Sequence, residues 1–166
     1  MSKINSRGFT LIELLIVIAI IAIIAGSVFV ALDPLTRFQD ARDTRRWSDI
    51  TALLAAIKIN QVDNKGSYIS SVASLATETN FMITDGITTP CNVPSCAGVS
   101  PAPSACVDLA ELVSKGYLGS VPVSPDGVGS WSPSYTGYVI NKSGVGTIKI
   151  QACEAENTPG GISVVR

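Results

Sequence analysis

The chain has 166 residues, of which 46% are hydrophobic and only 15% charged. It contains no histidine, which excludes Ser-His-Asp and Cys-His catalytic pairs, histidine metal ligands and a histidine pH switch. Its 12 Lys and Arg residues nearly balance its 13 Asp and Glu residues, so binding to nucleic acid by phosphate neutralisation is not supported. No spacing of Asp, Glu, Ser or Lys singles out a catalytic site, and we predict that the chain is not an enzyme.

The most apolar stretch lies close to the N-terminus. Residues 14–32 read LLIVIAIIAIIAGSVFVAL without one charge. A helix over 9–32 would be roughly 36 Å long, enough to cross a hydrocarbon core about 30 Å thick. Lys3 and Arg7 precede it without an acid, which predicts that the N-terminus stays cytoplasmic and that the rest of the chain is exported.

The junction before this stretch distinguishes between kinds of N-terminal segment. One alternative is a secretory signal, which would be cut after the apolar run; Ala25-Gly26-Ser27 is a weak candidate for that site. Another alternative is an anchor that is not cleaved. The junction itself reads SRGFTLIE over 6–13, a short basic leader followed by a glycine, an aromatic residue and one acid. It resembles the type IV pilin and type II secretion pseudopilin family. The resemblance implies that prepilin peptidase cuts after Gly8 and that Phe9 becomes the N-methylated first residue.

Glu13 is the one charged residue inside the apolar stretch. A carboxylate there costs about 2.5 to 3.5 kcal/mol on insertion scales unless it is neutral or paired. One interpretation is that Glu13, one turn from Phe9, reaches the membrane interface. The other, implied by the resemblance, is that Glu13 pairs with the Phe9 amine of a neighbouring subunit and sets the register of assembly.

A second helical pattern follows the apolar stretch. Asp33-Pro34 favours a helix start, so the chain kinks or restarts there. Apolar residues then recur at helical spacing and predict an amphipathic helix over 33–65: Leu35, Phe38, Ile50, Leu53, Leu54 and Ile57. The Arg and Asp residues between 37 and 49 form either a solvated face or contacts between subunits, of which we favour the second.

The remaining part, 66–166, has the composition of an exported globular head. From residue 67 onward the chain has seven acids and four bases and is rich in Gly, Pro, Ser and Thr, which suits a secreted domain with β-strands. We predict a helix over 104–116 and strands over 135–141 and 147–153. The fold class is therefore α+β: a cleaved leader (1–8), an apolar helix (9–32) and the amphipathic helix, packed on an antiparallel sheet as in the pilin ladle.

Four cysteines fall in the head: Cys91, Cys96, Cys106 and Cys153. Disulfides persist outside the cytoplasm, and four cysteines allow three connectivities. We prefer Cys91 with Cys96 and Cys106 with Cys153. Zinc is a weaker interpretation, because the spacing is poor for zinc ligands and thiols need a reducing compartment.

A segment of the head resembles the calcium loop of the major pseudopilins. Tyr117-Leu118 is followed by Pro122 and then by Ser124-Pro125-Asp126-Gly127. Calcium takes six to eight oxygens, usually with more than one carboxylate, and only Asp126 is acidic here. We predict a plain Pro-Asp-Gly turn, no cofactor and no metal, with Asp126 as a weak calcium candidate.

Together these features predict a type IV pilus subunit. The precursor would span the bacterial inner membrane once, be trimmed at Gly8, and be polymerised by the pilus assembly machinery with identical or related subunits into an extracellular filament. One alternative is a type II secretion pseudopilin. An alternative of another class is a monomeric, membrane-anchored binding protein whose head captures an extracellular ligand.

Overall fold

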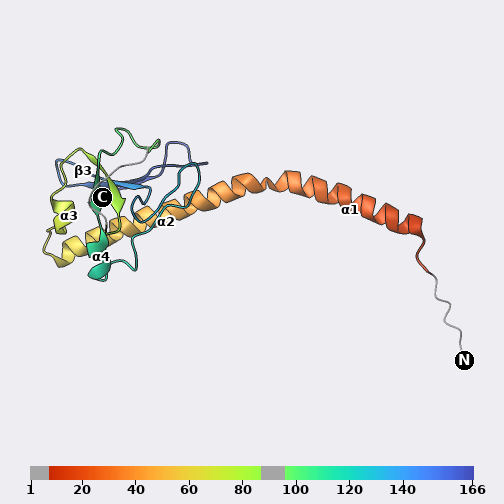
Figure 1. The fold of residues 1–166 in the computed structure, drawn as a ribbon, viewed down its shortest axis with the longest axis horizontal. Helices are drawn as coiled ribbons and strands as arrows, with labels where there is room; N and C mark the ends of the chain where they lie inside the picture. Colours follow the sequence, from red (N-terminus) through yellow and green to blue (C-terminus); the bar gives the residue numbers. More distant parts are fainter. Residues whose placement is uncertain (1–7, 87–95) are drawn as a thin grey trace, which may run out of the picture. The chain divides into compact units, whose positions relative to one another are not determined.

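A computed structural model describes residues 8–86 and 96–166. The chain divides into two compact units, the first ending at Arg37 and the second being Phe38–Arg166. The elements are α1 (Leu11–Leu32), α2 (Pro34–Asp63), α3 (Ser70–Ala73), β1 (Asn80–Thr84), β2 (Ala105–Asp108), α4 (Ala110–Ser114), β3 (Tyr138–Lys142), β4 (Ile148–Ala152) and β5 (Ser163–Val165) (Figure 1).

The apolar helix α1 has no buried residue. It begins with a capping box, in which the Thr10 side chain accepts a hydrogen bond from the Glu13 amide and the Thr10 amide donates to Glu13 Oε2 at 2.9 Å. It ends at Asp33, whose φ of 37° is left-handed and does not continue a helix. Among the described residues, the helical stretch Leu11–Asp63 contains the one segment that is long and apolar enough to cross a membrane.

In the second unit, α2 packs on one face of a five-stranded sheet. The helix contributes a buried stripe at helical spacing, made of Ile50, Leu53, Leu54, Ala56 and Ile57. The sheet contributes alternate residues, as expected for a strand with one face in the core: Ile83, Val107, Tyr138, Ile140, Ile148 and Ile150. This arrangement confirms the α+β prediction.

The sheet has the order β2-β1-β3-β4-β5. β3 and β4 form the expected antiparallel pair, with Ile140 opposite Ile150. The pattern did not reveal β1 and β5, which extend the sheet on either side. The sheet is mixed rather than purely antiparallel, because β1 and β2 are parallel.

The helix predicted over 104–116 is wrong in its first half. Ala105–Asp108 forms β2, and only Ala110–Ser114 is helical. The segment forms a strand because all four of its residues pair with β1 and Val107 is buried in the core. The Asp108 side chain, rather than Ser104, accepts a hydrogen bond from the first amide of the helix, that of Ala110, at 2.8 Å.

Candidate functional site

The predicted processing site lies in an open segment before α1. Gly8, Phe9 and Thr10 are exposed and not helical, and 84% of Phe9 is accessible. A Cβ built on Gly8 would meet nothing within 4 Å, so packing within the folded chain does not require a glycine here. An accessible bond outside the helix, with no side chain before it, is open to close approach by a protease.

Glu13 is bound locally in the isolated subunit. Both of its hydrogen bonds as an acceptor go to one oxygen, Oε2, which receives the Thr10 amide at 2.9 Å and the Thr10 hydroxyl at 2.7 Å. Within the described residues, Oε1 accepts no hydrogen bond. Sequence reasoning missed this partnership, although Thr-x-x-Glu before an apolar run is the signature of a capping box.

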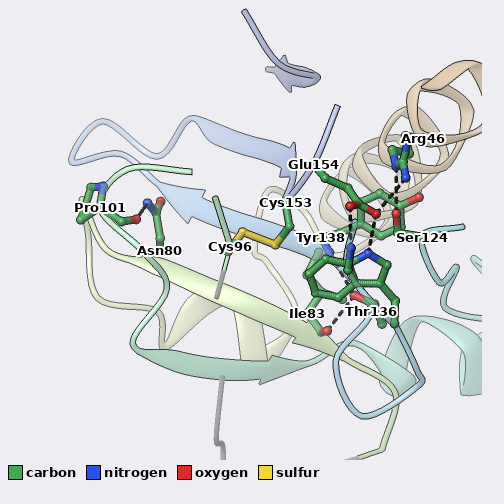
Figure 2. Close-up of a disulfide and its surroundings, with 12 residues drawn as sticks. Arg46, Asn80, Ile83, Cys96, Pro101, Ser124, Thr136, Tyr138, Cys153 and Glu154 are labelled. Atoms are coloured by element: carbon green, nitrogen blue, oxygen red, sulfur yellow. Dashed lines mark hydrogen bonds and ion pairs between the residues drawn. A yellow bond between two sulfur atoms is a disulfide. The ribbon is translucent and has the colours of Figure 1, made fainter. Parts of the chain in front are cut away.

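In the head, the side chain of Arg46 lies fully buried among three carboxylates. It contacts Asp43 at 2.8 Å, Glu154 at 2.8 Å and Glu156 at 2.9 Å. Its remaining donors reach Ser124 Oγ and the Pro125 carbonyl. The guanidinium therefore joins α2 to the loop before β3 and to the chain after β4 (Figure 2).

Glu154 extends this network to the second face of the sheet. One carboxylate oxygen accepts from the Arg46 guanidinium and from Trp131 Nε1, both at 2.8 Å. The other accepts the amides of Val128 and Gly129 at 2.9 Å. Glu154 thus fixes the position of the Trp131 loop as well as that of the arginine.

Hydrogen bonds outweigh burial in setting the pKa values of Asp43, Glu156 and Arg46, and so favour their charged forms. Desolvation raises the pKa of Asp43, but donors from Asn157, Glu156, Thr158 and Arg46 lower it below its ordinary value. The pKa of Glu156 is lowered, chiefly by its hydrogen bond from Arg42. Burial lowers the pKa of Arg46, yet its carboxylate partners raise it overall.

The lowered carboxylate pKa values predict acid sensitivity of the head. In an unfolded chain Asp and Glu titrate near pKa values of about 3.9 and 4.3. The stability that Asp43 and Glu156 contribute is fully present above those values and is lost as pH falls through their lower folded pKa values. We expect the denaturant midpoint, followed by tryptophan fluorescence, to fall between pH 7 and about pH 3. A Glu156→Gln variant should show a shallower fall, and a wild-type midpoint independent of pH would contradict the network's role.

These contacts decide between the two interpretations of the Arg and Asp residues of α2. Asp43 and Arg46 are neither solvated nor available to another subunit, because both are buried within one chain. The preference for contacts between subunits is therefore wrong for these two residues. Arg45, with 68% of its side chain accessible and a 3.9 Å contact to Asp49, remains accessible to another subunit.

The disulfide observed differs from both predicted pairs. Cys96 is bonded to Cys153 (Figure 2), so the pairs Cys91–Cys96 and Cys106–Cys153 are wrong. Cys106 lies in β2, and β1 and β3 separate that strand from β4. Three strand spacings of about 4.8 Å exceed the reach of a disulfide. None of the described cysteines is a free thiol, and Cys91 lies outside the described residues.

A close backbone contact brings Cys96 to its partner. The amide of Gly98 donates to the Cys153 carbonyl at 2.7 Å. A Cβ on residue 98 would lie 2.7 Å from that oxygen, so only glycine allows this approach. The disulfide belongs to a small cluster on the second face of the sheet, with Met82, Val99 and Val139.

We expect the Cys96–Cys153 bond to stabilise the head substantially, since it joins residues 57 apart in sequence. Replacing both cysteines with serine should lower the free energy of unfolding by about 2 to 4 kcal/mol. Non-reducing peptide mapping of the wild type should recover the two cysteines in one linked pair of peptides. A linked pair containing Cys106 and Cys153 would contradict this connectivity.

Two oxygens of the loop around Asp126, the weak calcium candidate, accept hydrogen bonds within the chain. Asp126 Oδ1 accepts the Trp131 amide at 3.0 Å, and the neighbouring Pro125 carbonyl accepts from Arg46. Within the described part of the chain, no group of three or more Cys, Asp or Glu residues is arranged for a metal. Asp126 Oδ1 and the Pro125 carbonyl thus already have hydrogen-bond donors, which is the arrangement of a plain turn.

The described residues form an apolar N-terminal helix and an α+β head. The prokaryotic N-terminal methylation motif matches residues 3–29, which include Gly8, Phe9 and Glu13. The motif indicates a precursor like those of type IV pilins or pseudopilins, which are structural proteins. No curated protein and no solved structure matches the chain.

Proposed function

We propose that the chain is a structural subunit of a type IV pilus, which polymerises through α1 after its leader is removed. The observation that carries the proposal is an apolar helix of 22 residues with none buried, next to an open Gly8–Phe9 bond. Each large apolar side chain left in water forgoes about 1.5 to 3 kcal/mol. Such a helix needs lipid before assembly and other copies of itself afterwards.

Cleavage changes the chemistry of the N-terminus. It removes Lys3 and Arg7 and creates a new amine on Phe9, one turn from Glu13. In the proposed assembly, that amine pairs with Glu13 of a neighbouring copy. The Oε1 atom of this Glu13, which accepts no hydrogen bond from the described residues of its own chain, can accept one from the amine. Pairing satisfies two charges in a water-poor environment and so sets the register between subunits. The head, which carries no part of this contact, forms the outer surface of the filament.

The mass of the intact protein tests processing. Under non-reducing conditions, we expect a chain that starts at Phe9, carries one added methyl group and lacks four hydrogens through two disulfides. We expect it to be abundant in filaments sheared from the cell surface. A Gly8→Glu variant should keep its leader and stay in the membrane, because a side chain before the cut blocks the close approach of the peptidase.

The same experiment separates the other candidate functions. The methylation motif does not distinguish a pilin from a pseudopilin, and short filaments confined to the cell envelope would favour the pseudopilin. A wild-type chain that keeps its leader and remains monomeric in the membrane would instead favour an anchored extracellular binding protein.

A further inference from the structure

One face of α2 is exposed at the spacing of a coiled-coil seam. The residues on this face recur alternately every three and four positions, and we call them the α2 seam: Arg45, Ser48, Ala52, Ala55, Ile59 and Val62. All are exposed except Ala55, which is half-buried; Ile59 is 54% and Val62 77% accessible. The opposite face of the helix packs on the sheet through Ile50, Leu53 and Ile57. Alternating spacing of three and four is the pattern that receives a second helix.

The α2 seam has a polar start, a middle of small residues and an apolar end. Small residues let a partner helix approach closely, and the partner must then supply large side chains opposite them. A hollow of about 140 Å³ opens beside Ala55, lined also by Thr51, Leu54, Val164 and Arg166. A large aliphatic side chain on the partner would fill this hollow.

Residues of α1 match the seam in size when the two helices are aligned so that Glu13, the one charge of α1, faces Arg45, the one charge of the seam. The same spacing then runs through Ile16, Ile20, Ile23, Ser27 and Val30. Isoleucines fall opposite Ser48, Ala52 and Ala55, and the small Ser27 falls opposite Ile59. Only a parallel α1 covers the seam in this register, since an antiparallel one would run from Arg45 back toward Phe38.

Arg45 and Glu13 both have hydrogen-bonding atoms available for this contact. The nearest carboxylate to Arg45 is Asp49, at 3.9 Å, and the same Asp49 oxygen accepts the Tyr138 hydroxyl at 2.6 Å. Glu13 has a free Oε1. Once α1 covers the seam and excludes water, each charge would be costly alone and is compensated by the other.

We propose that the α2 seam of one copy receives α1 of a second copy in parallel, with Arg45 against Glu13. This inference rests on the proposed function and names the contact that assembly uses. In this register each residue of α1 faces the α2 residue whose number is 32 higher, since 45 minus 13 is 32. A carboxylate accepts several hydrogen bonds, so Glu13 pairs with Arg45 of one neighbour and with the Phe9 amine of another.

Cysteine cross-linking between copies tests the register. Full-length chains carrying Ile20→Cys and chains carrying Ala52→Cys are produced together, and sheared filaments are oxidised and run on non-reducing gels. We expect a dimer about tenfold more abundant than with a matched control, Thr44→Cys in place of Ala52→Cys, because Thr44 is exposed on α2 but lies eight residues, or about 12 Å along the helix, before Ala52. Equal dimer in the two samples, or none in intact filaments, would overturn the proposal.

A charge reversal tests the pairing without cysteines. Arg45→Glu places two carboxylates together, so filament yield should fall about tenfold or more while processed subunits accumulate in the membrane. Arg45→Lys should keep most of the yield. Normal filaments from Arg45→Glu would refute the contact and leave the pilus subunit intact as a function. Absence of filaments from the wild type would instead refute the proposed function.

Discussion

Replacing Arg46 with alanine should lower the free energy of unfolding of the head by about 3 to 5 kcal/mol. The substitution removes a fully buried guanidinium and leaves Asp43, Glu154 and Glu156 without their shared cation. Their mutual repulsion in a place with little water is the main cost. The Trp131 loop should loosen at the same time, because Glu154 also accepts from Trp131 Nε1.

Denaturant unfolding of the processed full-length protein in detergent measures this effect. Arg45→Ala is the matched control, since it removes the same charge from the position immediately before Arg46. It should change stability by less than about 0.5 kcal/mol. Because the guanidinium supplies the cation of the network, neither calcium nor a chelator should move the wild-type midpoint. A loss below about 1 kcal/mol for Arg46→Ala would show that water or a shifted side chain replaces the guanidinium.

Replacing Glu13 with alanine should leave a processed, membrane-inserted subunit that yields about tenfold fewer filaments or less. Insertion becomes easier without the carboxylate, so loss of filaments cannot come from loss of the membrane form. The amine of a neighbour's Phe9 then has no counter-charge inside the filament. Glu13→Gln should be nearly as defective, because it keeps the shape but not the charge.

Two controls separate this contact from the capping of α1. Ser27→Ala removes another polar group of α1, whose hydroxyl donates to the Ile24 carbonyl at 2.8 Å. It should assemble normally, because alanine keeps the small size that the contact with Ile59 needs. Thr10→Val weakens the cap by about 1 kcal/mol but keeps the Glu13 charge, and should assemble better than Glu13→Ala. Filament yields from Glu13→Ala that equal the wild type would remove Glu13 from the mechanism.

The parts of the fold that the sequence predicted are those with a clear period. The apolar run of α1, the core stripe of α2 and the alternation of Ile148 and Ile150 each follow from a local pattern. The prediction of a helix over 104–116 was wrong because the conformation of this segment depends on pairing with β1, more than twenty residues earlier. A tertiary partner overrode the local preference there.

The buried network around Arg46 and the disulfide could not be predicted either, because their partners are distant in sequence. Asp43 and Arg46 are visible as a pair at helical spacing, but nothing near them indicates Glu154 or Glu156. The connectivity of four cysteines cannot be derived from spacing alone, and the shortest loop was a poor guide. The N-terminal site was accessible to sequence reasoning because its residues are consecutive and need no tertiary contact to be recognised.

The sequence distance between Arg46 and its partners bears on the order of events during export. Arg46 bonds Glu154 and Glu156, which follow it by 108 and 110 residues. While the chain is still being synthesised, the arginines and aspartates of α2 therefore have only one another and water as partners. In the proposed membrane precursor, this charge keeps α2 from following α1 into the bilayer, so the membrane segment ends near Asp33. The head of that precursor can complete its folding only after Glu154 and Glu156 have been exported, and the charges that delimit the anchor then become the centre of the folded domain.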